Sequence, residues 1–391
     1  MVSSKVVRHT KRKVPCTFLT SSLLNALLNK GVHHVHRIRR SLSLALFSTA
    51  LLALVGCGSN TTSTPPPPTP PPSTPPAQLT VWSNSLNGIP FTMVGTDPSL
   101  PNSGTTNVPV VIIPVALNFS AVGLVITPSG PACGDTDSIV DRVVNSPLFT
   151  NNDWVDVTGS TPVGNTQFGD AFQRMNFWQY VSSVSPNYHV MLSPVTVANA
   201  ITIDVPPGIG ATLTPSPTCP SQMLGAVPSS LIDSAVPSTV AALNITPGTL
   251  PIFLTYDISF VPQGFLGYHS MQGNQTYIVA SYIDIGFSDP TVAASDVAVL
   301  SHEIGEWMND PLLGNFVPPW GNMGIQSGCS SVLEVGDPLS RNIFSTPTAS
   351  FTYHVQELAF ASWFMGPYPS VAVDGLYSSL GSFTGPAPPC Q

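Results

Sequence analysis

Positive charge is scarce in this 391-residue sequence, and nearly all of it is confined to one end. Nine of the twelve lysines and arginines lie between Lys5 and Arg40, and no lysine follows Lys30. Beyond this leader, three arginines stand against all 20 acidic residues, which gives the rest of the chain a net charge of −17. Nucleic acids and anionic lipid headgroups bind basic surfaces, so neither is expected as a partner.

Motifs of several common enzyme classes are also missing. The sequence has no Gly-x-Ser-x-Gly nucleophile elbow and no Walker phosphate-binding loop. Residues 206–210 (Pro-Pro-Gly-Ile-Gly) contain glycine but lack the dinucleotide-binding fingerprint, and they are better interpreted as a turn. Serine hydrolases of this type, P-loop proteins and dinucleotide-dependent enzymes are therefore poorly supported.

The apolar run Leu42 to Val55 is too short to span a bilayer comfortably, because a spanning helix needs about 20 apolar residues. It follows a basic segment and ends in Leu54-Val55-Gly56-Cys57. This order resembles a bacterial lipoprotein signal peptide with its lipobox. The resemblance implies cleavage before Cys57, acylation of its thiol, and export to the periplasmic or outer side of a membrane. An uncleaved membrane anchor is the alternative.

The sequence divides into three regions. Residues 1–57 are the predicted signal peptide, and residues 58–77 are a Pro/Thr/Ser-rich tract that predicts an extended polyproline spacer. Residues 78–391 are long enough for a globular domain, and strand-like and helix-like segments alternate in it with many prolines and glycines. We predict a loop-rich α+β fold. The predicted strands are 108–119 (with Pro114 at a sheet edge or bulge), 188–192, 200–205, 251–258 and 276–284, and the predicted helices are 137–144, 167–181, 231–243 and 290–309.

Cysteine is also rare. Beyond Cys57 the sequence has Cys133, Cys219, Cys329 and Cys390. Four cysteines in an exported domain predict two disulfides, for which three pairings are possible. Pairing nearest neighbours in the sequence favours Cys133–Cys219 and Cys329–Cys390. None of the spacings is that of a Cys-x-x-Cys zinc site.

The segment His302-Glu303-Ile304-Gly305-Glu306 places three ionisable side chains within five positions, although only 8% of residues are charged. Ser288-Asp289-Pro290 is a helix-start signal, and Pro311 prevents helical geometry at Asp310. The predicted helix therefore runs from Pro290 to Asn309. At about 100° per residue, His302 and Glu306 lie one turn apart on one face, with Glu303 beside it.

This segment resembles the active-site helix of the zincin metallopeptidases, whose motif is His-Glu-x-x-His within apolar flanks. The resemblance implies a zincin-like mixed sheet, a zinc ion bound by His302 and Glu306, and Glu303 as the general base. Glu306 replaces the second histidine of the motif. A carboxylate also binds zinc, but it makes the site more anionic and admits calcium or manganese. The alternative is an ordinary amphipathic helix without a metal.

A catalytic zinc also needs a third protein ligand. His269 is our first candidate, because it lies in a Gly-containing turn before the strand that leads to this helix. Glu334 and Asp337 come next, because zincins use a downstream carboxylate, although turn chemistry alone explains Gly-Asp-Pro. His189 and His354 follow tyrosines in apolar segments, and we expect them to be hydrogen-bonded core or wall residues.

A weaker resemblance covers about the last third of the chain. Gly267-Tyr268-His269, the His-Glu-x-x-Glu segment, Asn309-Asp310-Pro311 and Glu334-x-Gly336-Asp337 are together similar to the plant phosphate-induced, Exordium-like secreted proteins. This resemblance implies an extracellular or cell-envelope role and suggests that Glu306 is a family feature.

Two functional hypotheses remain. The first is a lipid-anchored, extracytoplasmic metal-dependent hydrolase, most simply a zinc peptidase with a peptide or protein substrate and its metal site within residues 265–340. The second is a non-enzymatic envelope or adhesion protein in which the metal is structural or absent.

Overall fold

The computed structural model describes residues 77–215, 222–284 and 295–390. The predicted signal peptide, Cys57, nearly all of the proline-rich tract, Cys219 and the helix-start signal at 288–290 lie outside these residues. All described residues belong to one compact unit, Pro72–Gln391. Within the described part of the chain, no helix has both the length and the hydrophobicity needed to cross a membrane.

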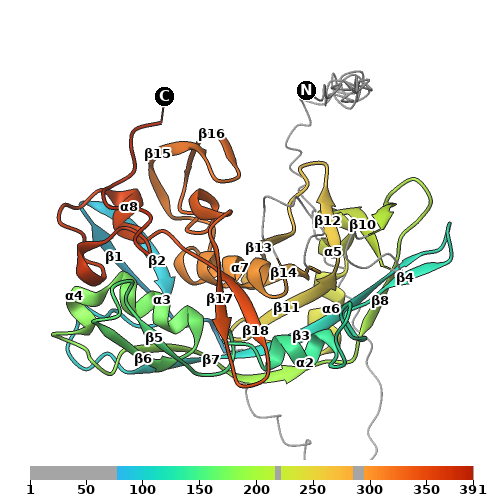
Figure 1. Cartoon of the computed structure of the whole chain (residues 1–391), viewed down its shortest axis with the longest axis horizontal. Coiled ribbons are helices and arrows are strands. Elements are labelled where there is room, and N and C mark those ends of the chain that lie inside the picture. The colour runs from blue at the N-terminus through green and yellow to red at the C-terminus, as the bar shows by residue number, and fades with distance from the viewer. Residues whose placement is uncertain (1–76, 216–221, 285–294, 391) are drawn as a thin grey trace, which may run out of the picture. The chain divides into compact units, whose positions relative to one another are not determined.

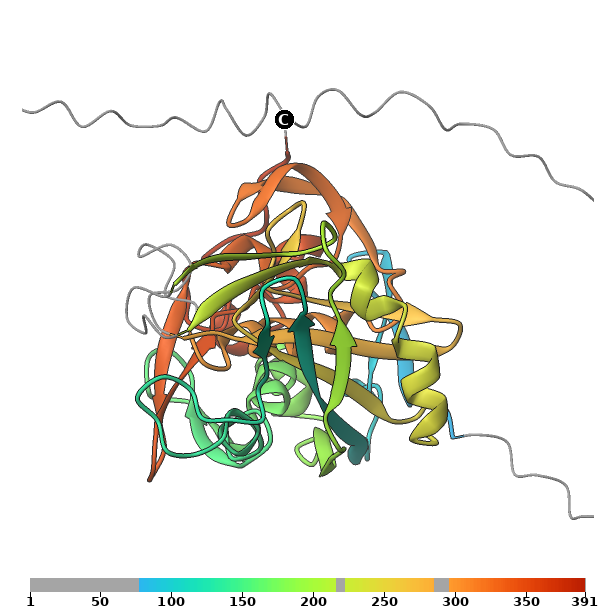
Figure 2. The ribbon, with the colours of Figure 1, turned by 90° about the vertical axis from the view of Figure 1, so that its right-hand side faces the viewer.

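A curled seven-stranded mixed sheet forms the centre of the fold (Figures 1 and 2). Its main path runs in the order β13 (Gly267–Gln272), β14 (Gln275–Tyr282), β11 (Leu250–Tyr256), β3 (Thr105–Phe119) and β4 (Leu124–Ile126), while β7 (His189–Val197) and β8 (Ile201–Asp204) both pair with β3. The pairs β14–β11, β11–β3, β3–β7 and β3–β8 are parallel, whereas β13–β14 and β3–β4 are antiparallel. Every residue of β11 and β14 is buried, as expected for strands covered on both faces.

Strand β3 is internal, so of the two predicted positions for Pro114, a sheet edge or a bulge, the edge was wrong. Pro114 pairs in register with Leu254 of β11. On the other side of β3, pairing with β7 ends at Ile112 and pairing with β8 begins at Val115. Proline has no N–H to donate, and here it lies at the break between two neighbouring strands, where no ladder partner is lost.

The remaining strands form a small sheet and four hairpins. The small sheet has β10 (Met223–Pro228) between β9 (Ala211–Pro215) and β12 (Ile258–Val261). The hairpins are β1 (Val81–Leu86) with β2 (Ile89–Val94), β5 (Asn152–Val155) with β6 (Pro162–Thr166), β15 (Phe316–Met323) with β16 (Gln326–Val332), and β17 (Ile343–Pro347) with β18 (Thr352–Gln356).

The helices are short and lie between these strands. They are α2 (Ile139–Val144), α3 (Phe168–Asn176), α4 (Trp178–Val181), α5 (Ser229–Asp233), α6 (Val236–Ala242), α7 (Ala298–Asn309) and α8 (Ala361–Met365), with single 3₁₀ turns η1 (Asp337–Leu339) and η2 (Val373–Gly375). The predicted helix 167–181 is interrupted at Phe177, and Pro237 lies in the first turn of α6, where proline is tolerated.

Helix α7 was predicted with the correct end but the wrong beginning. It ends at Asn309, and Asp310 then leaves helical geometry while its carboxylate accepts the N–H groups of Gly314 and Asn315. Residues 295–297 are not helical, so the helix begins at Ala298. The positive φ of 40° at Asp296 breaks the helical path immediately before it.

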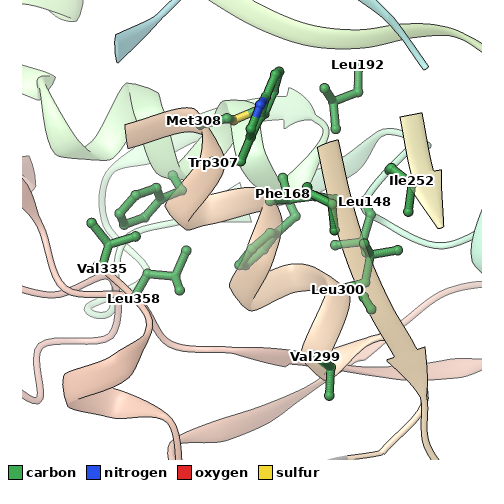
Figure 3. Close-up of a cluster of buried hydrophobic side chains, with 14 of the residues drawn as sticks. Leu148, Phe168, Leu192, Ile252, Val299, Leu300, Trp307, Met308, Val335 and Leu358 are labelled. Carbon is green, nitrogen blue, oxygen red and sulfur yellow. The ribbon is translucent and has the colours of Figure 1, made fainter. Parts of the chain in front are cut away.

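All twelve residues of α7 are buried, which makes it a core helix. In Figure 3, Val335 and Leu358 lie on one side of the helix, and Leu148, Leu192 and Ile252 lie on the other. Burial of such side chains contributes about 1.5–3 kcal/mol each and fixes the helix against its neighbours. The polar residues of α7 are therefore held in defined positions.

One predicted disulfide is confirmed. Cys329 on β16 is bonded to Cys390 near the C-terminus, with an S–S distance of 2.10 Å. Cys133 is also disulfide-bonded, but its predicted partner Cys219 lies outside the described residues. The fold is thus a strand-rich α+β arrangement with a curled mixed sheet and a disulfide, as predicted at that level.

Candidate metal centre

Helix α7 supplies three ionisable side chains to one pocket. The four-residue spacing places His302 Nε2 3.1 Å from Glu306 Oε1. Glu303 follows on the adjoining face, with its Oε1 4.0 Å from the same imidazole nitrogen. The remaining polar side chains at this level of the helix are used within the core, since Ser301 donates to Ala298 O and Asn309 to Gly305 O.

Two other elements bring the remaining predicted residues to this helix. Strand β13 places His269 Nδ1 3.6 Å from Glu306 Oε2 and 3.7 Å from Glu303 Oε2. The segment after β16 carries Glu334 into the same pocket, and Asp337, at the start of η1, has its Oδ1 3.5 Å from His302 Nε2. All six predicted site residues therefore line one pocket, although they come from three parts of the sequence.

The pocket has a volume of about 620 Å³, which is within the range of small-molecule and peptide sites. One wall carries the ionisable residues. The other lining residues include the apolar side chains of Phe265, Leu266, Val299, Ile325 and Ile343. The ionisable cluster therefore lies beside a space that an apolar ligand group can fill.

The charges of the pocket are unbalanced. Four carboxylates converge with two imidazoles, and none of the described residues that line the pocket is a lysine or arginine. Glu303 and His269 are almost fully buried, and neither Glu303 Oε2 nor His269 Nε2 has a hydrogen-bond partner. Burying ionised or unpartnered polar groups is costly. A divalent cation beside Glu303 would remove the cost of burying its carboxylate, and imidazole nitrogen with carboxylate oxygen is a donor set that zinc and manganese accept.

The pKa values of the residues follow from this crowding. Burial raises the pKa of Asp337 to about 7, and the Glu306 carboxylate adds to the effect. Burial and the charge of Glu306 also raise the pKa of Glu334 well above its usual value. For His302, burial acts to lower the pKa, but attraction to Glu306 and other carboxylates outweighs it and raises the pKa well above the usual value. Bound cations favour ionised carboxylates and neutral imidazoles, so metal binding would reverse these protonation states.

The orientation of His302 depends on a residue that belongs to none of the sequence motifs. Gln356, the last residue of β18, places its Oε1 3.1 Å from His302 Nδ1. Its amide Nε2 donates to the carbonyl of Gly336 at 2.6 Å, so Oε1 is the atom that faces the imidazole. The imidazole therefore donates its Nδ1–H to Gln356, and a metal ion between Glu306 and Asp337 would receive the Nε2 lone pair.

Gly336 contacts both Glu306 and His302. Its N–H donates to Glu306 Oε1 at 3.1 Å, and a Cβ added to it would come within 2.7 Å of His302 Cγ. The backbone can lie against the imidazole ring only because this position has no side chain. A glycine between Glu334 and Asp337 was the available signal of such a close approach, but the prediction rested on the two carboxylates alone.

The other two histidines among the described residues, His189 and His354, lie apart from this site, in agreement with the prediction. His189 Nδ1 is 2.7 Å from Asp170 Oδ2, and His354 Nδ1 is 2.6 Å from Asp296 Oδ2. Each histidine is thus hydrogen-bonded to a carboxylate of its own.

Among the described residues, two groups have ligand atoms close enough together to hold an ion. They are His302, Glu306 and Asp337, and His269, Glu303 and Glu306. Comparison of the chain with protein-family models, curated proteins and solved structures found no match. The geometry of the pocket is therefore the basis for any statement about function.

Proposed function

We propose that this protein is an exported, metal-dependent hydrolase whose substrates are peptides. The observation that carries the proposal is the arrangement of His302, Glu306 and Asp337 around one point, with Glu303 adjacent, in the wall of an accessible pocket. The zincin resemblance supports the same assignment of roles. Export rests on the lipoprotein-like signal that ends at Cys57.

In this proposal His302 Nε2, Glu306 and Asp337 hold a zinc ion. Three protein ligands leave a position open, which is the arrangement of catalytic rather than structural zinc sites. When bound, zinc lowers the pKa of water and polarises a carbonyl oxygen. Gln356 keeps His302 in the ligating tautomer, and Gly336 N–H orients Glu306.

Glu303 is the general base of the proposed reaction. It takes a proton from the attacking water and gives it to the leaving amine. Its pKa is raised by burial, although the two neighbouring imidazoles oppose this. A raised pKa suits a group that must both accept and release a proton near neutral pH.

The surroundings of the site favour a peptide in extended conformation. Strand β13 borders the pocket at Gly267, Tyr268 and His269, and among the described strands it pairs only with β14. A peptide can add to such a strand edge through backbone hydrogen bonds. The apolar walls at Phe265 and Ile343 would then receive a side chain of the substrate.

The substitution Glu303→Gln tests the catalytic role. We expect the variant to retain the ion held by His302, because the ligands of that ion are unchanged, but to lose at least about a hundredfold in hydrolysis of a peptide library, the lower range for general-base catalysis. Asp153→Asn, which makes the same carboxylate-to-amide change at an exposed residue outside the pocket, is the control and should keep its activity on the library. A fully active Glu303→Gln variant would contradict the assignment.

The alternative is a non-enzymatic envelope protein with a structural ion. The observation that favours it is the number of carboxylates, because calcium binds six to eight oxygen ligands. It predicts calcium rather than zinc in the purified protein, and no effect of Glu303→Gln on any hydrolysis rate. The imidazoles of His302 and His269 in the cluster favour the zinc enzyme instead.

A further inference from the structure

The carboxylate of Glu306 faces two different histidines. Its Oε1 is 3.1 Å from His302 Nε2, and its Oε2 is 3.6 Å from His269 Nδ1. The two imidazoles fall into different ligand groups, and Glu306 is the residue that both groups share. Two ligand atoms on one zinc ion are at most about 4.4 Å apart, since each of the two bonds is about 2.0–2.2 Å long. Each histidine is within this distance of its own oxygen of Glu306.

Each of the two groups has a complete set of its own. On one side, Asp337 Oδ1 is 3.5 Å from His302 Nε2. On the other side, Glu303 Oε2 is 3.7 Å from His269 Nδ1. Each side thus has one imidazole nitrogen, one private carboxylate and one oxygen of Glu306, with all ligand atoms of a group within 4.8 Å of one another.

In the group that contains His269, a separate observation also indicates a bound cation. Glu303 is 4% exposed, and its Oε2, the oxygen that faces His269, has no hydrogen-bond partner. A buried carboxylate oxygen without a donor is costly, and a cation between Glu303 and His269 would satisfy it. An ion on the His302 side alone would leave this oxygen unsatisfied.

The number of carboxylates in the pocket also favours two bound ions over one. The pocket is lined by four carboxylates, and the described lining residues include no lysine or arginine. One divalent ion would neutralise only half of these carboxylates, whereas two would neutralise all four. Hydrolases with paired ions hold them about 3.5–4 Å apart, a separation that one bridging carboxylate can span.

We propose that the pocket binds two divalent transition-metal ions, one at His302 and Asp337 and one at His269 and Glu303, with Glu306 bridging them. The inference rests on the proposed function only for the ion at His302. Glu303 uses Oε2 for the second ion and keeps Oε1, which faces His302, for its role as a base. The second ion adds positive charge opposite the first, where it can stabilise the developing oxyanion.

The experiment is metal titration of the full chain with zinc chloride, with the bound zinc counted by elemental analysis after removal of excess metal. Wild type should bind two zinc ions per chain. His269→Ala and Asp337→Asn should each bind one, and Glu303→Gln should also drop from two to one. His189→Ala, which removes a histidine outside the pocket, is the matched control and should keep two.

A second measurement on wild type does not depend on the folding of any variant. After loading with manganese chloride, two ions bridged by a carboxylate should give an exchange-coupled electron paramagnetic resonance spectrum, and isolated ions should not. One zinc per chain with uncoupled manganese would overturn the second site and leave the proposed function standing. Two zinc ions in His269→Ala would also overturn it. No bound metal would end both proposals.

Discussion

Gly336 is the residue at which the site is most sensitive to one added carbon. Its backbone is in the right-handed helical region, at φ −88° and ψ −35°, so alanine fits the backbone without strain. The obstacle is the imidazole of His302, which occupies the place of the new Cβ. The imidazole Nδ1 of His302 is hydrogen-bonded to Gln356 Oε1, so the ring cannot move away from the new Cβ without losing that hydrogen bond.

We therefore expect Gly336→Ala to weaken metal binding by about tenfold or more, the range found when contacts that orient a metal ligand are lost. The measurement is competition with a chromophoric chelator. Gly130→Ala is the control, because a Cβ there meets open space and the backbone φ is not in the left-handed region. Equal metal affinity of the two variants would show that the His302 ring does not need its present position.

At the scale of elements, the described part of β18 reaches the candidate metal centre through one side chain, that of Gln356. Gln356 connects α7 to the loop that carries Asp337, because it contacts both His302 and the Gly336 carbonyl. Its backbone N–H is also fixed, since it donates to Ser301 Oγ at 2.9 Å. The end of the strand is thus tied to the helix, and the side-chain amide is aimed at the imidazole.

Gln356→Leu should lower zinc affinity about 10–100-fold, because it removes the group that fixes the ligating tautomer of His302. Gln356→Glu keeps an oxygen for Nδ1–H and should recover most of the affinity. If the role of Gln356 were merely structural, both variants would have lower thermal stability but an unchanged dissociation constant for zinc. The prediction fails if Gln356→Leu and Gln356→Glu bind zinc equally well.

Two aspartates, Asp257 and Asp284, are buried close together just after the ends of β11 and β14. Asp257 is fully buried at a φ of 49°, and its Oδ1 accepts the backbone N–H of Asp284 at 2.9 Å. Burial and the charge of Asp284 raise the pKa of Asp257 to about 8. Since this pKa is far above that of an aspartate in the unfolded chain, about 3.9, the folded protein holds the extra proton.

Stability should consequently fall as pH rises from about 4 to about 8, because the folded state binds more protons than the unfolded state over that range. Asp257→Asn removes the titration, retains an oxygen acceptor, and suits the positive φ. We expect the variant to have a higher melting temperature than wild type at pH 8.5. At pH 5 the difference in melting temperature should be much smaller. A pH-independent difference in melting temperature would contradict this.

At the scale of the whole molecule, the features that depend on local pattern could be predicted from the sequence. The His-Glu-x-x-Glu spacing placed His302, Glu303 and Glu306 on one helix. Apolar runs located β3, β7, β8, β11 and β14, five of the seven strands of the central sheet, but not β4, β13 or the strands of the small sheet and the hairpins. Nearest-neighbour pairing also identified Cys329–Cys390, a link across 61 residues.

Features set by contacts between distant segments could not be predicted in this way. Gln356 is 54 residues from His302, and a lone glutamine carries no motif. The internal position of β3 depends on strands that are far away in the sequence, and so a sheet edge remained one of the two positions predicted for Pro114. His269 was a candidate because it was predicted in a turn before the strand that leads to the helix. That turn was wrong, since His269 lies on strand β13, whose antiparallel pairing with β14 places it opposite Glu306.

The metal content of the purified full chain, measured by elemental analysis beside that of His302→Ala, tests the central claim most directly. We predict stoichiometric zinc in wild type and loss of the ion held by His302 in the variant, which should remain folded because the substitution lies in the pocket wall. A folded, disulfide-bonded wild-type protein that binds no stoichiometric metal, even after zinc is added, would contradict the account.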